Sequence, residues 1–336
     1  MNVLGLSLDS TMINIALARA AHHYRETGHA FTLRRAGNMA AVEPHLDDPK
    51  WDLVIASTLF ERTKPLAERV RAIYPGAVIG GTGWRVESSL AELGIDEGPL
   101  DYADWNQTYS IGYSMRGCRL KCRFCVVPRK EGKARAAATI DEIYRGDPWP
   151  RHIMLLDNDL FGSPKWTDVI NALIAGRFRV CYSQGINARF LNDETAAAIA
   201  STDYRDRNFR ERRMITAWDG RKDEKRLFRG LELLVKYGIK PDNIEVYMLI
   251  GEEPGETHAD RDYRRARLRE FGCRPYPMPF SRDDDLVRWF QGWVIGAYDK
   301  SMPWEQWVAA KGNPRRLGLR KRVSLPLFRD DHGDEE

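Results

Sequence analysis

The chain has 336 residues, which is enough for about two domains. Hydrophobic residues make up 43% of it and charged residues 30%, and this ordinary globular usage excludes a disordered or fibrous chain. The 52 Lys and Arg residues against 48 Asp and Glu residues leave a formal net charge of +4, which is too even to indicate a nucleic acid or a membrane surface as a partner.

The N-terminal segment and the cysteine count bear on the compartment. No apolar run approaches the length of about 18 residues that a transmembrane helix needs, and the first residues lack the basic region and the cleavage site of a signal peptide. We therefore expect a cytoplasmic protein with no membrane partner. The five cysteines are an odd count, which argues against a disulfide framework. Three of them, Cys118, Cys122 and Cys125, are clustered within eight residues.

The first hundred residues alternate between strand and helix patterns. We expect strands at residues 3–8, 31–34, 52–57 and 77–81 and helices at residues 12–27, 63–72 and 86–93. This alternation predicts an α/β fold, with a Rossmann-like parallel sheet over residues 1–100. The polar stretch at residues 97–106, which contains Gly98 and Pro99, is typical of a domain boundary.

After this boundary the alternation restarts and continues for six rounds. We expect strands at residues 109–114, 152–157, 180–184, 213–218, 244–250 and 274–280, with helices at 140–145, 164–175, 193–200, 224–237 and 258–271. Such a series over residues 105–280 predicts a partial (β/α)6 barrel of the TIM type, with its chemistry at the carboxyl ends of the strands. The last strand is weakly predicted because Pro275, Pro277 and Pro279 alternate in it. Residues 281–336 read as a helical extension with a charged tail.

The clustered cysteines follow a predicted strand with the spacing C-x3-C-x2-C. Thiols this close in sequence indicate a shared soft metal. A closed zinc site takes four ligands, so zinc would need Cys181, Cys273 or His152 from a distant unit. Three cysteines without a fourth nearby suit a [4Fe–4S] cluster in which one iron stays open.

This segment resembles the signature of the radical S-adenosylmethionine (SAM) superfamily, C-x3-C-x-Φ-C, in which Φ is aromatic and is here Phe124. The resemblance extends over about residues 108–280, where the superfamily has a partial (β/α)6 barrel. It implies that Cys118, Cys122 and Cys125 hold three irons of a [4Fe–4S] cluster and that SAM chelates the fourth. It also implies an electron donor such as flavodoxin or ferredoxin, and the cleavage of SAM to a 5′-deoxyadenosyl radical that abstracts hydrogen from the substrate.

The resemblance implies further SAM contacts at the ends of later strands. Where the superfamily often has Gly-Gly-Glu after the second strand, this chain has Asp157 and Asn158, which lack the glycines but offer a carboxylate for the SAM ammonium. A capped turn is the structural alternative. Gly251 follows the fifth strand in a stretch similar to the superfamily's adenine-side motif, and glycine permits close backbone approach. The residues placed to meet ribose, carboxylate or substrate after the third strand are Gln184, Asn187 and Arg189.

An α/β domain before such a barrel resembles the cobalamin-binding domain of one branch of the superfamily. The lower-ligand motif of that branch, Asp-x-His-x-x-Gly, does not occur in residues 1–100. The histidines there suit solvated or helix-end positions, and some members bind cobalamin without that ligand, so cobalamin stays open as a cofactor. An ordinary methylthiotransferase is excluded, because no cysteine precedes Cys118 to hold a second cluster.

The tail at residues 315–322 is rich in Arg and Lys. It suits either an RNA-binding arm or a solvated surface, and the frequent Trp and Tyr suit either nucleobase stacking or core packing. We expect a radical SAM enzyme acting on an unidentified small-molecule, nucleoside or peptide substrate. The alternatives are a cobalamin-dependent methylase of the same superfamily and a non-catalytic zinc or Fe–S module that binds nucleic acid.

Overall fold

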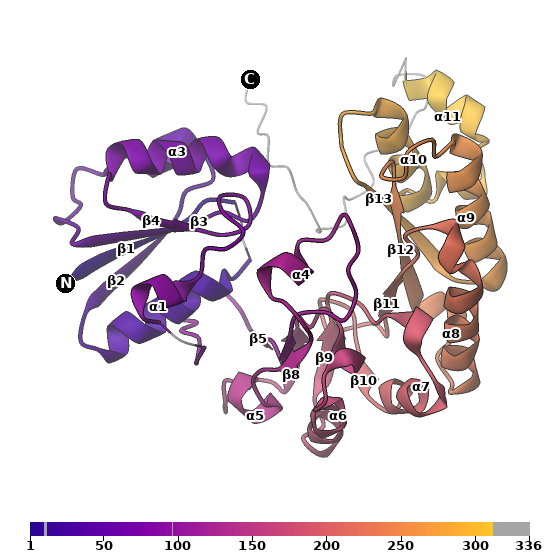
Figure 1. Ribbon diagram of the computed structural model, residues 1–336, viewed down its shortest axis with the longest axis horizontal. Helices are drawn as coiled ribbons and strands as arrows, with labels where there is room; N and C mark the ends of the chain where they lie inside the picture. Colours follow the sequence, from indigo (N-terminus) through magenta and orange to yellow (C-terminus); the bar gives the residue numbers. More distant parts are fainter. Residues whose placement is uncertain (10–11, 96, 312–336) are drawn as a thin grey trace. The chain divides into compact units, whose positions relative to one another are not determined.

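The computed structural model describes residues 1–9, 12–95 and 97–311 and has a mixed α/β fold with parallel sheets (Figure 1). The chain forms two compact units: unit 1 comprises Met1–Asn187 and Asn192–Met214, and unit 2 comprises Ala188–Leu191 and the chain from Ile215 onward. The basic segment at residues 315–322 lies outside the described residues. None of the helices in the described part of the chain combines the length and the apolar character that crossing a membrane requires.

The first sheet of unit 1 has the order β2-β1-β3-β4, and all of its strands are parallel. Its strands are β1 (Asn2–Ser7), β2 (Ala30–Arg35), β3 (Leu53–Ser57) and β4 (Val78–Gly80), and its helices are α1 (Ile15–Glu26), α2 (Met39–Val42) and α3 (Lys64–Ile73). Successive strand residues point to opposite faces. Val3 therefore packs with Leu17 of α1 on one face, whereas Leu4 packs with Val70 of α3 on the other.

The expected helix at residues 86–93 is wrong for its first half. Only the short 3-10 helix η2 (Leu90–Leu93) forms there. The Ser88 hydroxyl donates to the carbonyl oxygen of Arg85 at 2.8 Å, and the backbone N–H of Ser89 donates to Glu92 at 3.2 Å. A serine hydroxyl that binds a nearby backbone group, as that of Ser88 does, favours a turn or a helix start over a helix interior.

The second sheet of unit 1 has the order β10-β9-β8-β5 and is also parallel. Its strands are β5 (Ser110–Gly112), β8 (His152–Leu155), β9 (Arg179–Tyr182) and β10 (Asp203–Tyr204), with helices α5 (Ile140–Ile143), α6 (Trp166–Ala175) and α7 (Asp193–Ala200). Strand β10 was not predicted, because two residues carry no periodic signal.

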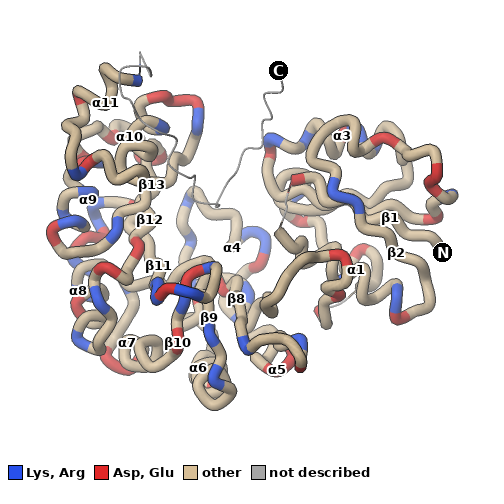
Figure 2. The backbone as a smooth tube through the Cα atoms, turned by 180° about the vertical axis from the view of Figure 1, so that it is seen from behind, with Lys and Arg blue, Asp and Glu red and all other residues tan. Residues whose placement is uncertain are grey.

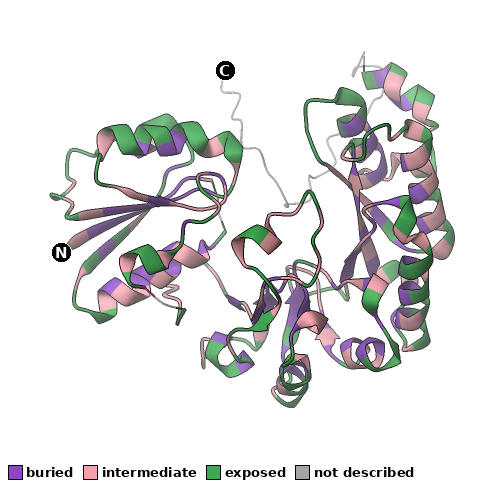
Figure 3. Ribbon diagram, viewed as in Figure 1, coloured by how far each residue is buried: buried purple, intermediate pink, exposed green. Residues whose placement is uncertain are grey.

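One hydrophobic core runs through unit 1 across the predicted domain boundary. Leu17 and Ala18 of α1 belong to the same buried cluster as Ile111 of β5, Met154 of β8 and Cys181 of β9. Figure 3 shows the buried strands and the exposed outer faces of helices such as α3. The polar stretch at residues 97–106 is therefore a connection within one packed unit.

Unit 2 contains the sheet β11-β12-β13. Its strands are β11 (Met214–Ala217), β12 (Ile244–Ile250) and β13 (Arg274–Pro279), and its helices are α8 (Glu224–Lys236), α9 (His258–Phe271), α10 (Asp285–Ile295) and α11 (Trp304–Lys311). Acidic and basic residues interleave along α8 and α9 (Figure 2). This mixing agrees with the nearly even charge of the whole sequence.

The proline-rich β13 pairs in parallel with β12 over its whole length. Its three prolines stand at every second position, and β13 is an edge strand. The N–H groups of successive strand residues point alternately to the two sides of the strand. Prolines lack this N–H, so prolines at every second position remove donors from one side of β13 only. The other side remains able to pair with β12, which is why this weakly predicted strand forms.

Candidate functional site

The clustered cysteines lie on a closed loop that follows β5. Strand β6 (Met115–Arg116) pairs antiparallel with β7 (Arg135–Ala136), and residues 117–134 between them form what we call the cysteine loop. The loop also contains the short helix α4 (Val127–Lys130). The N–H of Ala137 donates to the carbonyl oxygen of Ser114 at 2.9 Å, which extends the closure by one step. The sequence alone predicted neither short strand.

Glu131 fastens the two ends of the cysteine loop. Its carboxylate accepts hydrogen bonds from the N–H of Gly117 at 2.9 Å and from Nδ2 of Asn158 at 3.1 Å. It also pairs with the guanidinium of Arg116 at 3.0 Å, and the Glu131 side chain is only 8% exposed. One buried carboxylate thus joins the start of the loop, its end and the turn after β8.

Gly117 permits a close backbone approach at the same place. Its φ is +79°, and a Cβ atom there would lie 2.2 Å from the carbonyl oxygen of Lys133. The next residue, Cys118, donates its N–H to the carbonyl oxygen of Gly132 at 3.2 Å. A residue with a side chain would be strained at this φ, and its Cβ atom would clash with the carbonyl oxygen of Lys133. Only glycine therefore suits this position.

The three cysteines form no disulfide and are partly buried. Burial raises the pKa of the Cys118 thiol; the Leu120 N–H, 3.4 Å from Sγ, opposes this, while the charges of Asp159, Cys125 and Cys122 add to it. Cys122 and Cys125 are joined by a backbone hydrogen bond of 3.0 Å. The side chain of Phe124 between them is 36% exposed.

Three thiols on one loop are the donor set that a thiolate-ligated iron–sulfur cluster uses. Within residues 1–9, 12–95 and 97–311, no group of three or more His, Cys, Asp or Glu is arranged to hold a metal ion. The other candidates for a zinc ligand are packed in apolar surroundings. Burial raises the pKa of both Cys181 and Cys273 to about 12. His152 stacks on Phe209 with ring centroids 4.7 Å apart.

The polar side chains after β8 hold the cysteine loop and the strand before it. Asp157 is buried and accepts hydrogen bonds from the N–H groups of Ser114 at 2.8 Å and Met115 at 3.1 Å, and from the Ser114 hydroxyl. Burial raises the pKa of Asp157 to about 6, although these hydrogen bonds oppose the shift. Asn158 donates to Glu131. These two candidates for SAM contacts therefore both have partners within the protein.

Asp159 follows Asp157 and Asn158 in the stretch that stands in place of Gly-Gly-Glu, and it anchors the residue after the first cysteine. Its carboxylate binds Arg119 through Nε at 2.9 Å, Nη2 at 3.0 Å and the backbone N–H at 3.2 Å. Two parallel bonds between guanidinium and carboxylate fix direction as well as distance. Gly162 leaves room for this carboxylate, since a Cβ there would lie 2.3 Å from Oδ2 of Asp159.

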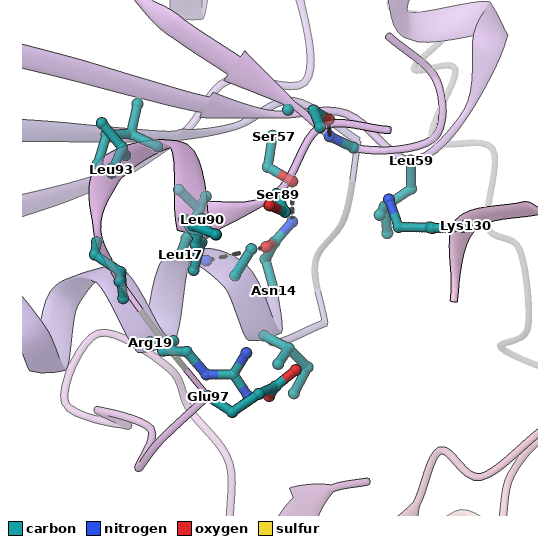
Figure 4. Close-up of a pocket in the computed structure, with 18 of the residues that line it drawn as sticks. Asn14, Leu17, Arg19, Ser57, Leu59, Ser89, Leu90, Leu93, Glu97 and Lys130 are labelled. Carbon is teal, nitrogen blue, oxygen red and sulfur yellow. Dashed lines mark hydrogen bonds and ion pairs between the residues drawn. The ribbon is translucent and has the colours of Figure 1, made fainter. Parts of the chain in front are cut away.

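A cavity of about 590 Å³ lies beside the cysteine loop in unit 1 (Figure 4). Its walls include residues that follow β1, β3 and β4 in the first sheet, and Leu156 and Gln184 that follow β8 and β9 in the second. Lys130 and Arg116 line it from the cysteine loop and its base. Gln184 is thus the candidate SAM contact that faces a cavity. Asn187, farther along the same turn, is half-buried.

The two remaining candidates lie in unit 2. Arg189 of η4 (Ala188–Phe190) pairs with Asp223 at 2.6 Å and is largely buried. Gly251 follows β12 with φ +75°, and its N–H donates to Oε2 of Glu256 at 2.6 Å. Glu256 also binds Arg261 and the buried Arg264, so it closes the loop after β12.

Sequence reasoning missed the residues that support the cysteine loop. Glu131 and Asp159 each act on a partner brought near by folding. A glutamate followed by a glycine is too common in sequences to have indicated the role of Glu131. Comparison of the chain with models of protein families, with curated proteins and with solved structures found no match.

Proposed function

We propose that this chain is a radical SAM enzyme in which Cys118, Cys122 and Cys125 bind a [4Fe–4S] cluster. The observation that carries the proposal is the position of the three thiols on one closed loop, directly after the β5 strand of a parallel sheet. Ligands and catalytic groups of α/β proteins gather at the carboxyl ends of such strands. The strand order and parallel pairing likewise support a Rossmann-like first sheet, and the parallel strands β5, β8, β9 and β10 of the second sheet support the first part of a partial barrel.

The cluster would supply an electron that cleaves SAM reductively, and hydrogen abstraction from the substrate follows. The protein's own part is to hold the loop. Glu131 and Gly117 close its base, and Asp159 orients Arg119 next to Cys118. Gln184 faces the neighbouring cavity. An external one-electron donor of the flavodoxin or ferredoxin type is part of the proposal, as is the cytoplasm, where the five cysteines, none of which forms a disulfide, stay reduced.

Anaerobic reconstitution with iron and sulfide tests this function. We expect an absorbance shoulder near about 400 nm that bleaches with dithionite, and formation of 5′-deoxyadenosine from SAM. Cys118→Ser, Cys122→Ser and Cys125→Ser should each abolish both signals. The matched controls Cys181→Ala and Cys273→Ala, which change cysteines packed elsewhere, should keep them. A colourless protein that holds one zinc would overturn the proposal.

Two other functions make different predictions. A cobalamin-dependent methylase would retain a pink or orange cofactor after purification with hydroxocobalamin, but the described lining of the cavity contains no histidine to serve as a cobalt ligand. A nucleic-acid-binding module would bind RNA through the tail at residues 315–322 and would turn over no SAM. We expect the protein to retain no cobalamin. We also expect SAM cleavage to persist when the tail is removed.

A further inference from the structure

The cavity of unit 1 lies where the topology of the first sheet favours a ligand site. In the order β2-β1-β3-β4, the chain passes from β1 to β2 on one side of β1 and then crosses from β2 to β3 on the other side of β1. Open parallel sheets bind ligands in the crevice at such a switch point, outside the carboxyl ends of the strands. Ser57 at the end of β3 and Gly80 at the end of β4 line the cavity. Its 590 Å³ is within the range of about 300–1,000 Å³ for small-molecule sites.

Most of the cavity wall is apolar. Leu17, Leu90 and Leu93 line one side, and Leu59 lies across from them near Lys130 (Figure 4). Leu59 is 43% exposed, whereas Leu17 is fully buried. An apolar ligand body would cover the exposed part of Leu59 and gain the free energy of removing it from water.

The charged part of the wall holds the three cations Arg19, Arg116 and Lys130 and the two carboxylates Glu92 and Glu97. Arg19 pairs with Glu97 at 2.6 Å, and that glutamate is 60% exposed. Nζ of Lys130 donates a long hydrogen bond of 3.4 Å to the carbonyl oxygen of Val86. Burial lowers the pKa of Lys130, and the charge of Arg116 lowers it further.

Arg116 adds an unused donor. Its Nη2 pairs with Glu131, its Nη1 lies 3.9 Å from Glu97 and its guanidinium lies over the ring of Tyr113, but among the described residues its buried Nε has no hydrogen-bond partner. A buried donor without a partner is costly, and a guanidinium forms its strong, directional hydrogen bonds with anionic oxygens.

We propose that this cavity binds an organic anion with a mainly apolar body. The body lies against the leucines, and the anionic group lies on the side of Arg116 and Lys130. Most of the cavity wall lies outside the cysteine loop: it comes from the first sheet, α1, η2 and the carboxyl ends of β5, β8 and β9. The site therefore does not depend on the cluster chemistry.

Two fluorescent probes with the same ring system test the proposal. Anilinonaphthalenesulfonate carries a sulfonate, and phenylnaphthylamine lacks it. We expect the purified full-length protein, with native near-ultraviolet circular dichroism, to bind the sulfonate with a single-site isotherm at least about tenfold more tightly than the amine, the difference expected of one charge-assisted contact. Equal affinities, or no binding of the sulfonate, would overturn the proposal.

Three variants locate the binding. Lys130→Met should weaken sulfonate binding about tenfold and leave amine binding unchanged, while Lys133→Met, an exposed lysine outside the cavity, should change neither. Leu59→Trp should fill the cavity and reduce binding of both probes, and its exposed position lets the fold tolerate it. Sulfonate binding that survives both Lys130→Met and Leu59→Trp would overturn the proposal.

The triple variant of Cys118, Cys122 and Cys125 to serine should bind the sulfonate as wild type does, so failure of the cluster proposal is distinguishable from failure of this one.

Discussion

The carboxylate of Glu131 accepts a hydrogen bond from the backbone N–H of Gly117 at 2.9 Å. This bond joins the residue directly before Cys118 to the segment that follows Cys125. The same side chain pairs with Arg116 and is nearly buried. The loop that carries the three thiols is thus closed by one charged residue, and loss of that charge leaves a guanidinium without its counter-ion.

We expect Glu131→Gln to lower the free energy of unfolding by about 3 kcal/mol, because removing one partner of a buried ion pair leaves the other uncompensated. Iron content after reconstitution should fall as well. Urea denaturation and an iron assay measure the two effects. The control is Glu87→Gln, at a well-exposed glutamate 4.0 Å from Arg129, where we expect at most about 0.5 kcal/mol. Equal losses in the two variants would contradict the role of Glu131.

Gly117 and Gly132 form a matched pair for the backbone of the cysteine loop. Their φ angles are +79° and +76°, but a Cβ would meet the Lys133 carbonyl at 2.2 Å in the first case and nothing within 4 Å in the second. Gly132→Ala should cost about 1 kcal/mol, the strain of a left-handed residue. Gly117→Ala should cost more and also prevent cluster assembly, since the clash displaces the chain next to Cys118. Thermal unfolding and absorbance near about 400 nm measure this; similar results for both variants would refute it.

Burial raises the pKa of Asp157 to about 6 from its ordinary value of 3.8. Between these two values the folded state binds more protons than the unfolded state, so the free energy of unfolding falls as pH rises. The contribution of Asp157 is fully present below about pH 4 and is lost above about pH 6, and it amounts to about 3 kcal/mol.

The variant Asp157→Asn does not titrate and keeps an oxygen to accept from Ser114 and Met115. Its stability relative to wild type should therefore increase by about 3 kcal/mol between pH 4 and pH 7. Urea denaturation of both proteins at these pH values measures the difference, in which the effects of all other groups cancel. A difference that is the same at both values would show that Asp157 is ionised in the folded state throughout.

Two helix glycines of unit 2 should respond to alanine with opposite signs. A Cβ at Gly230 of α8 would lie 1.9 Å from the carbonyl oxygen of Ala188, whereas at Gly292 of α10 the nearest atom would be a Trp307 carbon at 3.6 Å. Gly292→Ala should stabilise the protein by about 1 kcal/mol through helix propensity. Gly230→Ala should destabilise it by about 2 kcal/mol through overpacking. Chemical denaturation measures both, and stabilisation by Gly230→Ala would show that α8 does not contact η4 this closely.

The long elements follow from the sequence because their signals are local. Helix α7, helix α9 and strand β12 begin and end where the apolar periodicity predicts. The side chains of Thr139 and Glu142 cap α5 as a capping box, which is also a local pattern. The short strands β6, β7 and β10 have two residues each, and pairing with a distant segment rather than any local pattern creates them.

The sequence by itself determined the spacing of the three cysteines and the presence of the longer strands β5 and β8 before and after them. Tertiary structure alone decided which polar side chains support the cysteine loop and which line the cavity. Asp157 binds Ser114 across 43 residues of sequence, and Asn158 binds Glu131 across 27. Asp157, a candidate for the SAM ammonium, is thereby buried against backbone N–H groups, whereas Gln184 faces the cavity. Residue type and spacing set what a side chain can donate or accept, but burial and partners depend on which distant segments the fold brings together.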